Sequence, residues 1–345
     1  MSITEQESVS ARQDIATSAG AVEGRSPWRL AWERLRRDKL AMISIGVIVL
    51  MALLAIFAGV ISDLIGHPPG AQYRDIGLSP AGIPQPPSGT FLFGTDGLGR
   101  DVFVRVLYGT RVSLLVGFSC SIGAVVVGMT IGVLAGYYGG LVDAFLSRAL
   151  DIILSMPFLL FGYALAAVFS PSLWLVLGVI VFFSLAAVGR IVRGQTLSIK
   201  EKEYIEAARS LGASDRRIMF TEIVPNVLAP VLVYASLLVP ISIIFSASLS
   251  FLGLGVPPGT PAWGSMINSA KEYYTVAPWL FLFPGVALLL TTLAFNLLGD
   301  GIRDALDPKA DRFLPFKKKR KKGQGRNSPD EPAAATGAGR RGEEY

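Results

Sequence analysis

The chain has 345 residues, of which 51% are hydrophobic and 17% are charged, and its mean hydropathy is +0.50. Soluble domains carry roughly 25% charged residues, so this composition excludes a soluble globular protein and indicates an integral membrane protein. The formal charge of +6 does not indicate nucleic-acid binding, because Lys and Arg gather beside apolar runs, as they do at the inner face of a membrane.

The N-terminal part is predicted to hold a tail, an interfacial helix and a first span. Residues 1–25 lack a periodic apolar pattern, which predicts a disordered tail. A short amphipathic helix on the inner membrane surface is indicated next by Trp28, Trp32 and Leu35. The apolar run Leu40–Ile61 exceeds the roughly 7–15 residues of a signal-peptide core. We therefore interpret residues 26–64 as this helix and an uncleaved anchor.

Residues 65–111 separate the first two apolar runs and are expected on the extracytoplasmic side of the membrane. A Pro/Gly-rich loop precedes the motif Gly94–Asp101, which leads into an outer amphipathic helix with its apolar face formed by Val102, Phe103, Val106 and Leu107. No Lys-Ser/Thr pair follows the glycines, which favours a structural turn over a phosphate-binding loop. His67 is the sole histidine, so a histidine-built metal or general-base site is excluded, and we interpret it as a solvated loop residue.

Five further spans form the predicted core, residues 112–302, and bring the total to six. They are Val112–Gly136, Ile152–Phe169, Leu173–Gly189, Leu228–Val256 and Ala277–Leu298. The short linker Ser170–Ser172 predicts a tight helical hairpin of the third and fourth spans. The spacing Gly128-x3-Gly132-x3-Gly136 predicts a close helix contact, with a neighbour in this chain or in a partner. Cys120, the sole cysteine, excludes an intrachain disulfide and is either packed or lipid-facing.

The distribution of basic residues predicts the topology. Basic residues flank the first and last spans and place both termini in the cytoplasm. The basic tail 303–345 is predicted to be disordered, with the Lys317–Lys322 run contacting anionic lipid. The segment between the fourth and fifth spans is then cytoplasmic too, which its own basic residues support: Arg190, Arg193, Lys200 and Lys202.

Ionisable residues are scarce in the predicted spans. Proton- or ion-coupled carriers usually hold a carboxylate or His near the bilayer centre, whereas here Asp143, Arg148 and Asp151 lie at the inner end of the third span. Asp151 either pairs with a basic group at the cytoplasmic rim or solvates a helix end. Four prolines are expected to bend their spans: Pro157, Pro230, Pro240 and Pro284.

A polar segment, residues 201–226, lies between the fourth and fifth spans. Good helix formers run from Glu206 to Leu211, Gly212 suits a helix C-terminus, and Ser214 can cap a second helix that Pro225 would end. Two short helices at an angle make a rigid knob. The small side chains of Ala207 and Ala208 allow close approach of a partner, and the rim is charged through Arg209, Arg216 and Arg217.

This segment resembles the EAA loop of bacterial ABC importer permeases, a helix-turn-helix that docks into a groove on an ATPase subunit. The positions that match are Glu206, Ala207, Ala208, Gly212 and Pro225, whereas Glu222 and Val224 replace the family's Ile and Leu. Further segments resemble the branch that imports dipeptides, oligopeptides and nickel. They are Gly94–Asp101, Asp151–Pro157, Leu249–Gly255, Trp263–Gly264 and Leu293–Pro308.

The resemblance implies an all-α, six-span type I ABC importer permease in the bacterial cytoplasmic membrane, of the C-type found in dipeptide and oligopeptide systems. It would translocate peptides by alternating access and contact its ATPases through Glu206, Ala207, Ala208, Arg209, Gly212 and Pro225. Implied partners are a related permease in a heterodimer, two ABC ATPases or one fused ATPase, and an extracytoplasmic peptide-binding protein.

The chain is not expected to be an enzyme or to hold a cofactor. It contains no Gly-x4-Gly-Lys-Ser/Thr motif and no grouping of nucleophile, base and orienting residue, so ATP and Mg would be bound by the partner subunits. A permease for nickel, glutathione or another small solute is the alternative within the family. A membrane-embedded enzyme or a secondary carrier would be a different class.

Overall fold

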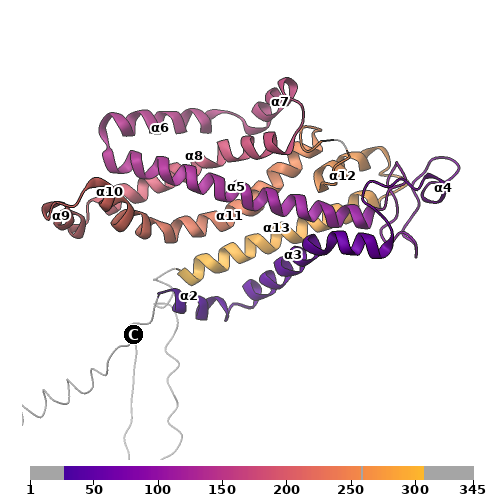
Figure 1. Ribbon diagram of the computed structural model, residues 1–345, viewed down its shortest axis with the longest axis horizontal. Helices are drawn as coiled ribbons and strands as arrows, with labels where there is room; N and C mark the ends of the chain where they lie inside the picture. Colours follow the sequence, from indigo (N-terminus) through magenta and orange to yellow (C-terminus); the bar gives the residue numbers. More distant parts are fainter. Residues whose placement is uncertain (1–26, 258, 307–345) are drawn as a thin grey trace, which may run out of the picture. The chain divides into compact units, whose positions relative to one another are not determined.

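A computed structural model describes residues 27–257 and 259–306, and this part is helical without a β-strand (Figure 1). The predicted tail 1–25 and the Lys317–Lys322 run lie outside the described residues. Within the described part, five helical runs are long and apolar enough to cross a membrane. They are α3 (Lys39–Ile65), α5 (Val102–Tyr138), α8 (Leu173–Lys200), the run Asp215–Phe251 and α13 (Trp279–Leu306). The all-helical membrane fold is therefore confirmed.

The predicted third span is not one helix. It is divided between α6 (Gly140–Ser155) and α7 (Phe158–Val168), which are bent by 84° relative to each other. The break follows from Pro157, which cannot donate a backbone hydrogen bond and pushes Met156 into an extended conformation, with φ −80° and ψ 133°. The predicted hairpin with α8 therefore involves only the short α7, while α6 packs along α8 and α5.

The predicted outer helix and the second span form a single helix, α5. Its 37 residues correspond to a length of about 55 Å, well beyond a hydrocarbon core of about 30 Å. Asp101 begins the helix, because its side chain accepts hydrogen bonds from the backbone N–H of Phe103 and Val104 at 2.8 and 3.4 Å. The outer turns of α5 thus extend a membrane helix and position the loops around it.

Close packing of α5 against α8 depends on the three regularly spaced glycines. A Cβ atom on Gly128 would lie 2.7 Å from the carbonyl oxygen of Leu185, and one on Gly132 would lie 2.6 Å from that of Gly189. Gly136 faces Thr196 in the same way, at 2.7 Å from its Cβ. The neighbour of the small-residue stripe is therefore α8 of this chain. Cys120 on α5 is fully buried, so it is packed inside the bundle and does not face lipid.

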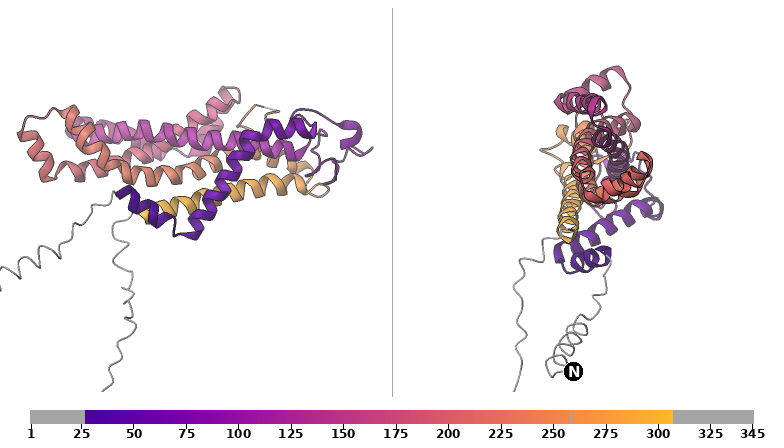
Figure 2. Two further views of the ribbon diagram at one scale, coloured as in Figure 1. Left: turned by 60° about the horizontal axis from the view of Figure 1, so that its bottom comes forward. Right: turned by 90° about the vertical axis from the view of Figure 1, so that its left-hand side faces the viewer.

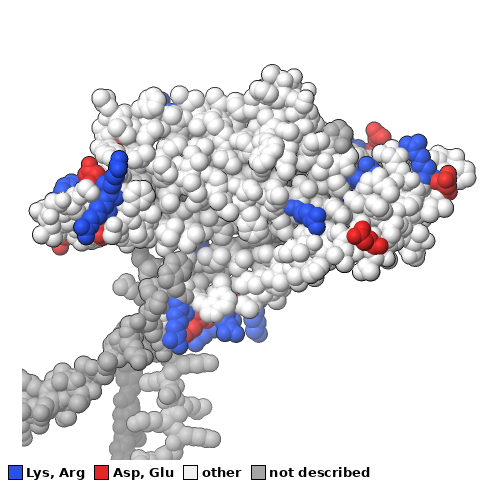
Figure 3. All heavy atoms as spheres, in the orientation of Figure 1, with Lys and Arg blue, Asp and Glu red and all other residues white. Residues whose placement is uncertain are grey.

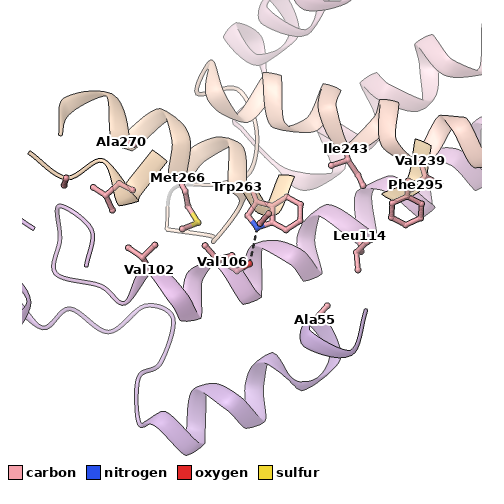
Figure 4. Packing of buried hydrophobic residues seen from close by; sticks show 13 residues of the cluster. Ala55, Val102, Val106, Leu114, Val239, Ile243, Trp263, Met266, Ala270 and Phe295 are labelled. Carbon is pink, nitrogen blue, oxygen red and sulfur yellow. Dashed lines mark hydrogen bonds between the residues drawn. The ribbon is translucent and has the colours of Figure 1, made fainter. Parts of the chain in front are cut away.

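The remaining helices pack around this pair. α11 (Val224–Phe251) contacts α5, α8 and α13, and α13 in turn packs against α3 and α2 (Pro27–Leu35), as Figure 2 shows. α12 (Trp263–Ser269) is short and continues into η2 (Ala270–Glu272). Trp263 is buried, and its Nε1–H donates to the carbonyl oxygen of Val106 at 3.1 Å, which joins α12 to α5 (Figure 4).

Charged side chains gather toward the two ends of the bundle. Figure 3 shows Lys, Arg, Asp and Glu at the end that carries α9 (Glu203–Ser210), beside α2, and at the end that carries α4 (Arg74–Gly77), with almost none between. We call these the α9 end and the α4 end. An uncharged band is what a bilayer requires of the surface it covers.

His67 at the α4 end is not the solvated residue that the sequence predicted. Its side chain is 12% exposed, and its Nδ1 lies 2.7 Å from Oδ2 of Asp101, whose side chain is 2% exposed. The ring also stacks on Phe91, at 5.1 Å between centroids. The prediction was wrong because Asp101 and Phe91 are distant in sequence, and nothing near His67 reveals this enclosure.

Candidate functional site

Residues 201–226 form two helices joined by a turn at the α9 end. α9 ends at Ser210, and Gly212 follows with a φ of +82°, a left-handed conformation that favours glycine. The turn is closed by backbone hydrogen bonds from Gly212 to Arg209 and from Ala213 to Ala208, at 3.0 and 3.1 Å. Oγ of Ser214 then accepts from the N–H of Arg217, capping α10 (Asp215–Arg217).

The second helix does not end at Pro225, contrary to the sequence prediction. α10 continues through the π-helical turns of η1 (Ile218–Ile223) into α11, and Pro225 stands in the first turn of α11. The N–H of Val224 bonds to the carbonyl oxygen of Met219, five residues back, so the wider π turn leads into the proline. Pro225 therefore lies inside a continuous helical run, directly after the π turn, and not at the helix end that the sequence predicted.

Apolar side chains fix this helix pair to the bundle. Ile205 of α9 and Ile218 and Ile223 of η1 are buried in one cluster with residues of α5 and α8. Tyr137, near the end of α5, adds a polar link, because its hydroxyl donates to Oδ1 of Asp215 at 2.7 Å. The guanidinium of Arg209 lies over the same ring, 5.9 Å from its centroid. The segment is therefore fixed to α5 and α8 by apolar packing and to Tyr137 by a hydrogen bond and a ring contact.

The outer surface of the segment carries the residues singled out from the sequence. The exposed ones are Glu206, Ala207, Arg209, Gly212 and Pro225, whereas Ala208 is half-buried. Ala208 and Gly212 are brought together at a hollow of about 200 Å³, which Arg217 and Glu222 also line. Pro225 does not line that hollow, and the carboxylate of Glu206 makes no hydrogen bond or ion pair with any residue that the structure describes; its backbone N–H donates to the carbonyl oxygen of Lys202 at 3.3 Å.

Two large apolar side chains on this surface were not predicted from the sequence. Leu211 is 89% exposed and Phe220 is 72% exposed, although both lie in a polar segment at the end of the bundle. Bulky apolar residues exposed beside charges are typical of a surface that a partner covers. Ile205 defines the buried side of α9, and Ile218 defines that of η1. Leu211 and Phe220 lie off these buried sides, and that position identifies them as exposed apolar residues.

Ion pairs join α6 and α8 on the same half of the bundle. Arg193 holds Asp143 with two nitrogens, and the Nη2–Oδ2 distance is 2.7 Å. Arg190 pairs with Asp151. Of the two roles considered for Asp151, pairing with a basic group and solvating a helix end, the structure contains the ion pair. The Arg190–Asp151 pair is exposed, where an ion pair contributes at most about 1 kcal/mol, whereas Arg193 and Asp143 are partly buried.

Comparison with known families identifies two matching regions. Residues 128–312 match the family described as binding-protein-dependent transport system inner membrane component. Residues 26–87 match the N-terminal transmembrane domain of oligopeptide transport permease C.

Curated relatives align with most of the chain. A dipeptide transport system permease protein, DppC of Alkalihalophilus pseudofirmus, is 42% identical over 82% of this chain and 90% of its own length. Glutathione transport system permease proteins, GsiD, are 41% identical in Pectobacterium atrosepticum and 45% identical in Salmonella paratyphi A. The Pectobacterium protein aligns over 83% of this chain and 92% of its own length. The Salmonella protein aligns over 83% of this chain and 91% of its own length. The inward-facing MetNI methionine ABC transporter is similar over 59% of this chain and 96% of its own, with 20% identity and a TM-score of 0.48.

Proposed function

The chain belongs to the family of binding-protein-dependent transport system inner membrane components, and from that premise we propose that it is the C-type permease of an ATP-driven importer for dipeptides and short oligopeptides. The observation that carries this proposal is the knob formed by α9, α10 and η1, which is exposed outward and fixed inward to α5 and α8. Its residues Glu206, Ala207, Ala208 and Gly212 match the EAA loop.

The permease has the type I importer arrangement and works as a passive pathway subunit in the bacterial inner membrane. It pairs with a related permease, and ATP is hydrolysed by two ATPases, or one fused ATPase, docked on the knob from the cytoplasm. When the ATPases close, the knob moves as a rigid body and carries α5, α8 and α11 with it. An extracytoplasmic binding protein delivers the peptide to the α4 end. Both termini lie in the cytoplasm.

Glutathione import is a second candidate. The three permeases compared above have similar identities, between 41% and 45%, and two of them are named for glutathione. Glutathione is itself a small peptide, so one pathway suits both substrates. Uptake by liposomes that contain the full complex, measured with labelled dipeptides, tripeptides and glutathione, distinguishes them by the substrate that drives the larger ATP-dependent accumulation.

Charge reversal and turn disruption on the knob test the docking role. Glu206→Lys places a positive charge where the ATPase groove would receive a negative one. Gly212→Asp forces a side chain into a left-handed turn at a cost of about 1–2 kcal/mol. We expect each variant to insert normally in the membrane, to lose co-purifying ATPase and to lose peptide uptake.

Matched controls exist at the α4 end. Asp75→Lys makes the same change of charge at an exposed acidic residue, and Gly82→Asp makes the same substitution at a glycine with a φ of +74° and an open surrounding. Both controls should retain the ATPase and transport peptide. Normal ATPase retention by both knob variants would show that the knob is not the docking element.

Topology is tested by labelling single cysteines from outside intact cells. In a chain whose Cys120 has been replaced, Gly70→Cys should react with an impermeant maleimide, and Ser214→Cys should react only after the membrane is opened. The reverse pattern would contradict the proposed orientation. The purified chain without ATPase subunits should also hydrolyse no ATP.

A further inference from the structure

The motif Gly94–Asp101 forms one wall of a polar pocket at the α4 end. The opposite wall comes from the end of α12 and from η2, and the space between them is about 380 Å³, within the size range of small-ligand sites. The side chains that line it are mostly polar: Asp96, Arg100, Asn268, Ser269, Lys271, Glu272 and Tyr273. The docking role of the α9 end accounts for none of these residues.

The walls of this pocket are held rigidly. A Cβ atom on Gly97 would lie 2.6 Å from the hydroxyl oxygen of Tyr273 and 2.7 Å from two of its ring carbons, so the motif's backbone packs directly on that side chain. Trp279 of α13 donates from Nε1 to the carbonyl oxygen of Thr95 at 3.3 Å. Oδ1 of Asp96 accepts from the N–H groups of Leu98 and Arg100, which closes the turn. The pocket is therefore formed before any ligand arrives.

A single carboxylate serves two nearly buried guanidinium groups beside the pocket. Oδ2 of Asp96 lies 2.8 Å from Nε of Arg100 and 3.5 Å from Nε of Arg105. The two arginine side chains are only 14% and 5% exposed. Nη1 of Arg105 donates a hydrogen bond to the carbonyl oxygen of Pro69 at 3.1 Å. Neither Nη atom of Arg100 has a hydrogen-bond partner among the described residues, so both donors are available in the pocket that this residue lines.

The charges around the pocket leave one positive charge in excess. The charged residues that line the pocket balance, Arg100 and Lys271 against Asp96 and Glu272, and the excess comes from Arg105, which pairs with Asp96 but lines the adjoining smaller space. Lys271 lies over the Phe251 ring, 3.7 Å from its centroid, and has no carboxylate within ion-pair distance in the described part of the chain. Lys271 is exposed, whereas Arg100 and Arg105 are nearly buried and share the single carboxylate of Asp96, and buried cations without a full counter-charge are costly. An anion entering the pocket would remove that cost.

We propose that this pocket binds the terminal carboxylate of the transported peptide as it leaves the binding protein. The planar guanidinium of Arg100 presents paired N–H donors that match the two oxygens of a carboxylate. Asn268 and Ser269 line the same space and can hydrogen-bond to the adjoining peptide group. The inference rests on the proposed function, because it names the chemical group of the imported peptide that the permease recognises.

Direct binding tests the inference without requiring transport. The complete permease–ATPase complex in lipid nanodiscs, without the binding protein, is titrated with dialanine and with dialanine amide by saturation-transfer NMR. The complex should prefer the free acid by about tenfold, the scale of a charge-assisted hydrogen-bonded pair. Arg100→Gln should abolish the preference by weakening only the acid, and Arg100→Lys should retain part of it.

The matched control is Arg74→Gln, an exposed arginine of α4 that does not line the pocket and that bonds to Gln72 at 3.1 Å. It should preserve the preference for the free acid. Unchanged binding of the amide in Arg100→Gln shows that the protein remains folded. Equal binding of acid and amide by the unaltered complex would overturn the inference, and so would an equal loss of both ligands in Arg100→Gln.

Uptake into liposomes that contain the binding protein separates this inference from the proposed function. ATP-dependent uptake of dialanine by the unaltered complex supports the importer, whatever Arg100→Gln does. Uptake of the acid should fall about tenfold in Arg100→Gln. If Arg100→Gln instead weakens attachment of the empty binding protein, the pocket receives an acidic side chain of that protein and the inference is wrong. Absence of all ATP-driven uptake, with acid-selective binding intact, would contradict only the importer assignment.

Discussion

Enlarging Gly132 should separate α5 from α8 and destabilise the bundle. A Cβ atom there would lie 2.6 Å from the carbonyl oxygen of Gly189 and 2.7 Å from Cβ of Val192, whereas ordinary contacts begin near 3.4 Å. The obstacles are a backbone atom and a β-carbon, so no flexible side-chain end can move aside. Gly132→Val therefore requires a shift of the helices by several tenths of an ångström, and such overpacking costs about 1–3 kcal/mol.

Gly194→Val is the matched control for this substitution. Gly194 lies on α8, is exposed and has no atom within 4 Å of a built Cβ. Both variants make the same small change in helix propensity, so the difference between them reports packing. In detergent, fluorescence-detected size exclusion after heating should give a midpoint about 2–10 °C lower for Gly132→Val. Equal midpoints for the two variants would refute the packing argument.

Three further outcomes are expected. Tyr137→Phe removes the hydrogen bond to Asp215, worth about 0.5–1.5 kcal/mol, and hydrogen exchange in residues 203–217 should quicken while the rest of the chain is unaffected. Trp263→Phe removes one donor to the carbonyl oxygen of Val106, which still accepts from Oγ1 of Thr110, so the heating midpoint should fall by an amount equivalent to about 0.5–1.5 kcal/mol. Cys120 is buried and should resist a membrane-permeant maleimide until the protein is unfolded; rapid labelling of the folded chain would contradict its packed position.

The candidate docking surface was largely accessible from the sequence because its signals are local. The turn after α9 follows from Gly212, and the start of α10 follows from the Ser214 cap, both features of neighbouring residues. Leu211 and Phe220 required the structure, since their exposure depends on which side of each helix faces the bundle. Pro225 was misread because the π turn that accommodates it has no comparable sequence signal.

The pairings between distant segments depended on the tertiary structure. Asp143 binds Arg193, and His67 binds Asp101, each across dozens of residues. The glycine stripe of α5 predicted a close neighbour, and only the structure shows that this neighbour is α8.

Hydrophobic length, helix caps and turn residues are properties of a short stretch of chain, so the sequence by itself determined the membrane class, the approximate spans and the polar knob. Which side chains meet depends on how helices of similar hydrophobicity are arranged around one another, and in this chain several arrangements share the same apolar pattern. Pro157 predicted a bend from its local effect on the chain, but the 84° size of that bend and the shared carboxylate of Asp96 emerge only when the helices are packed together, because the arrangement of distant segments decides them.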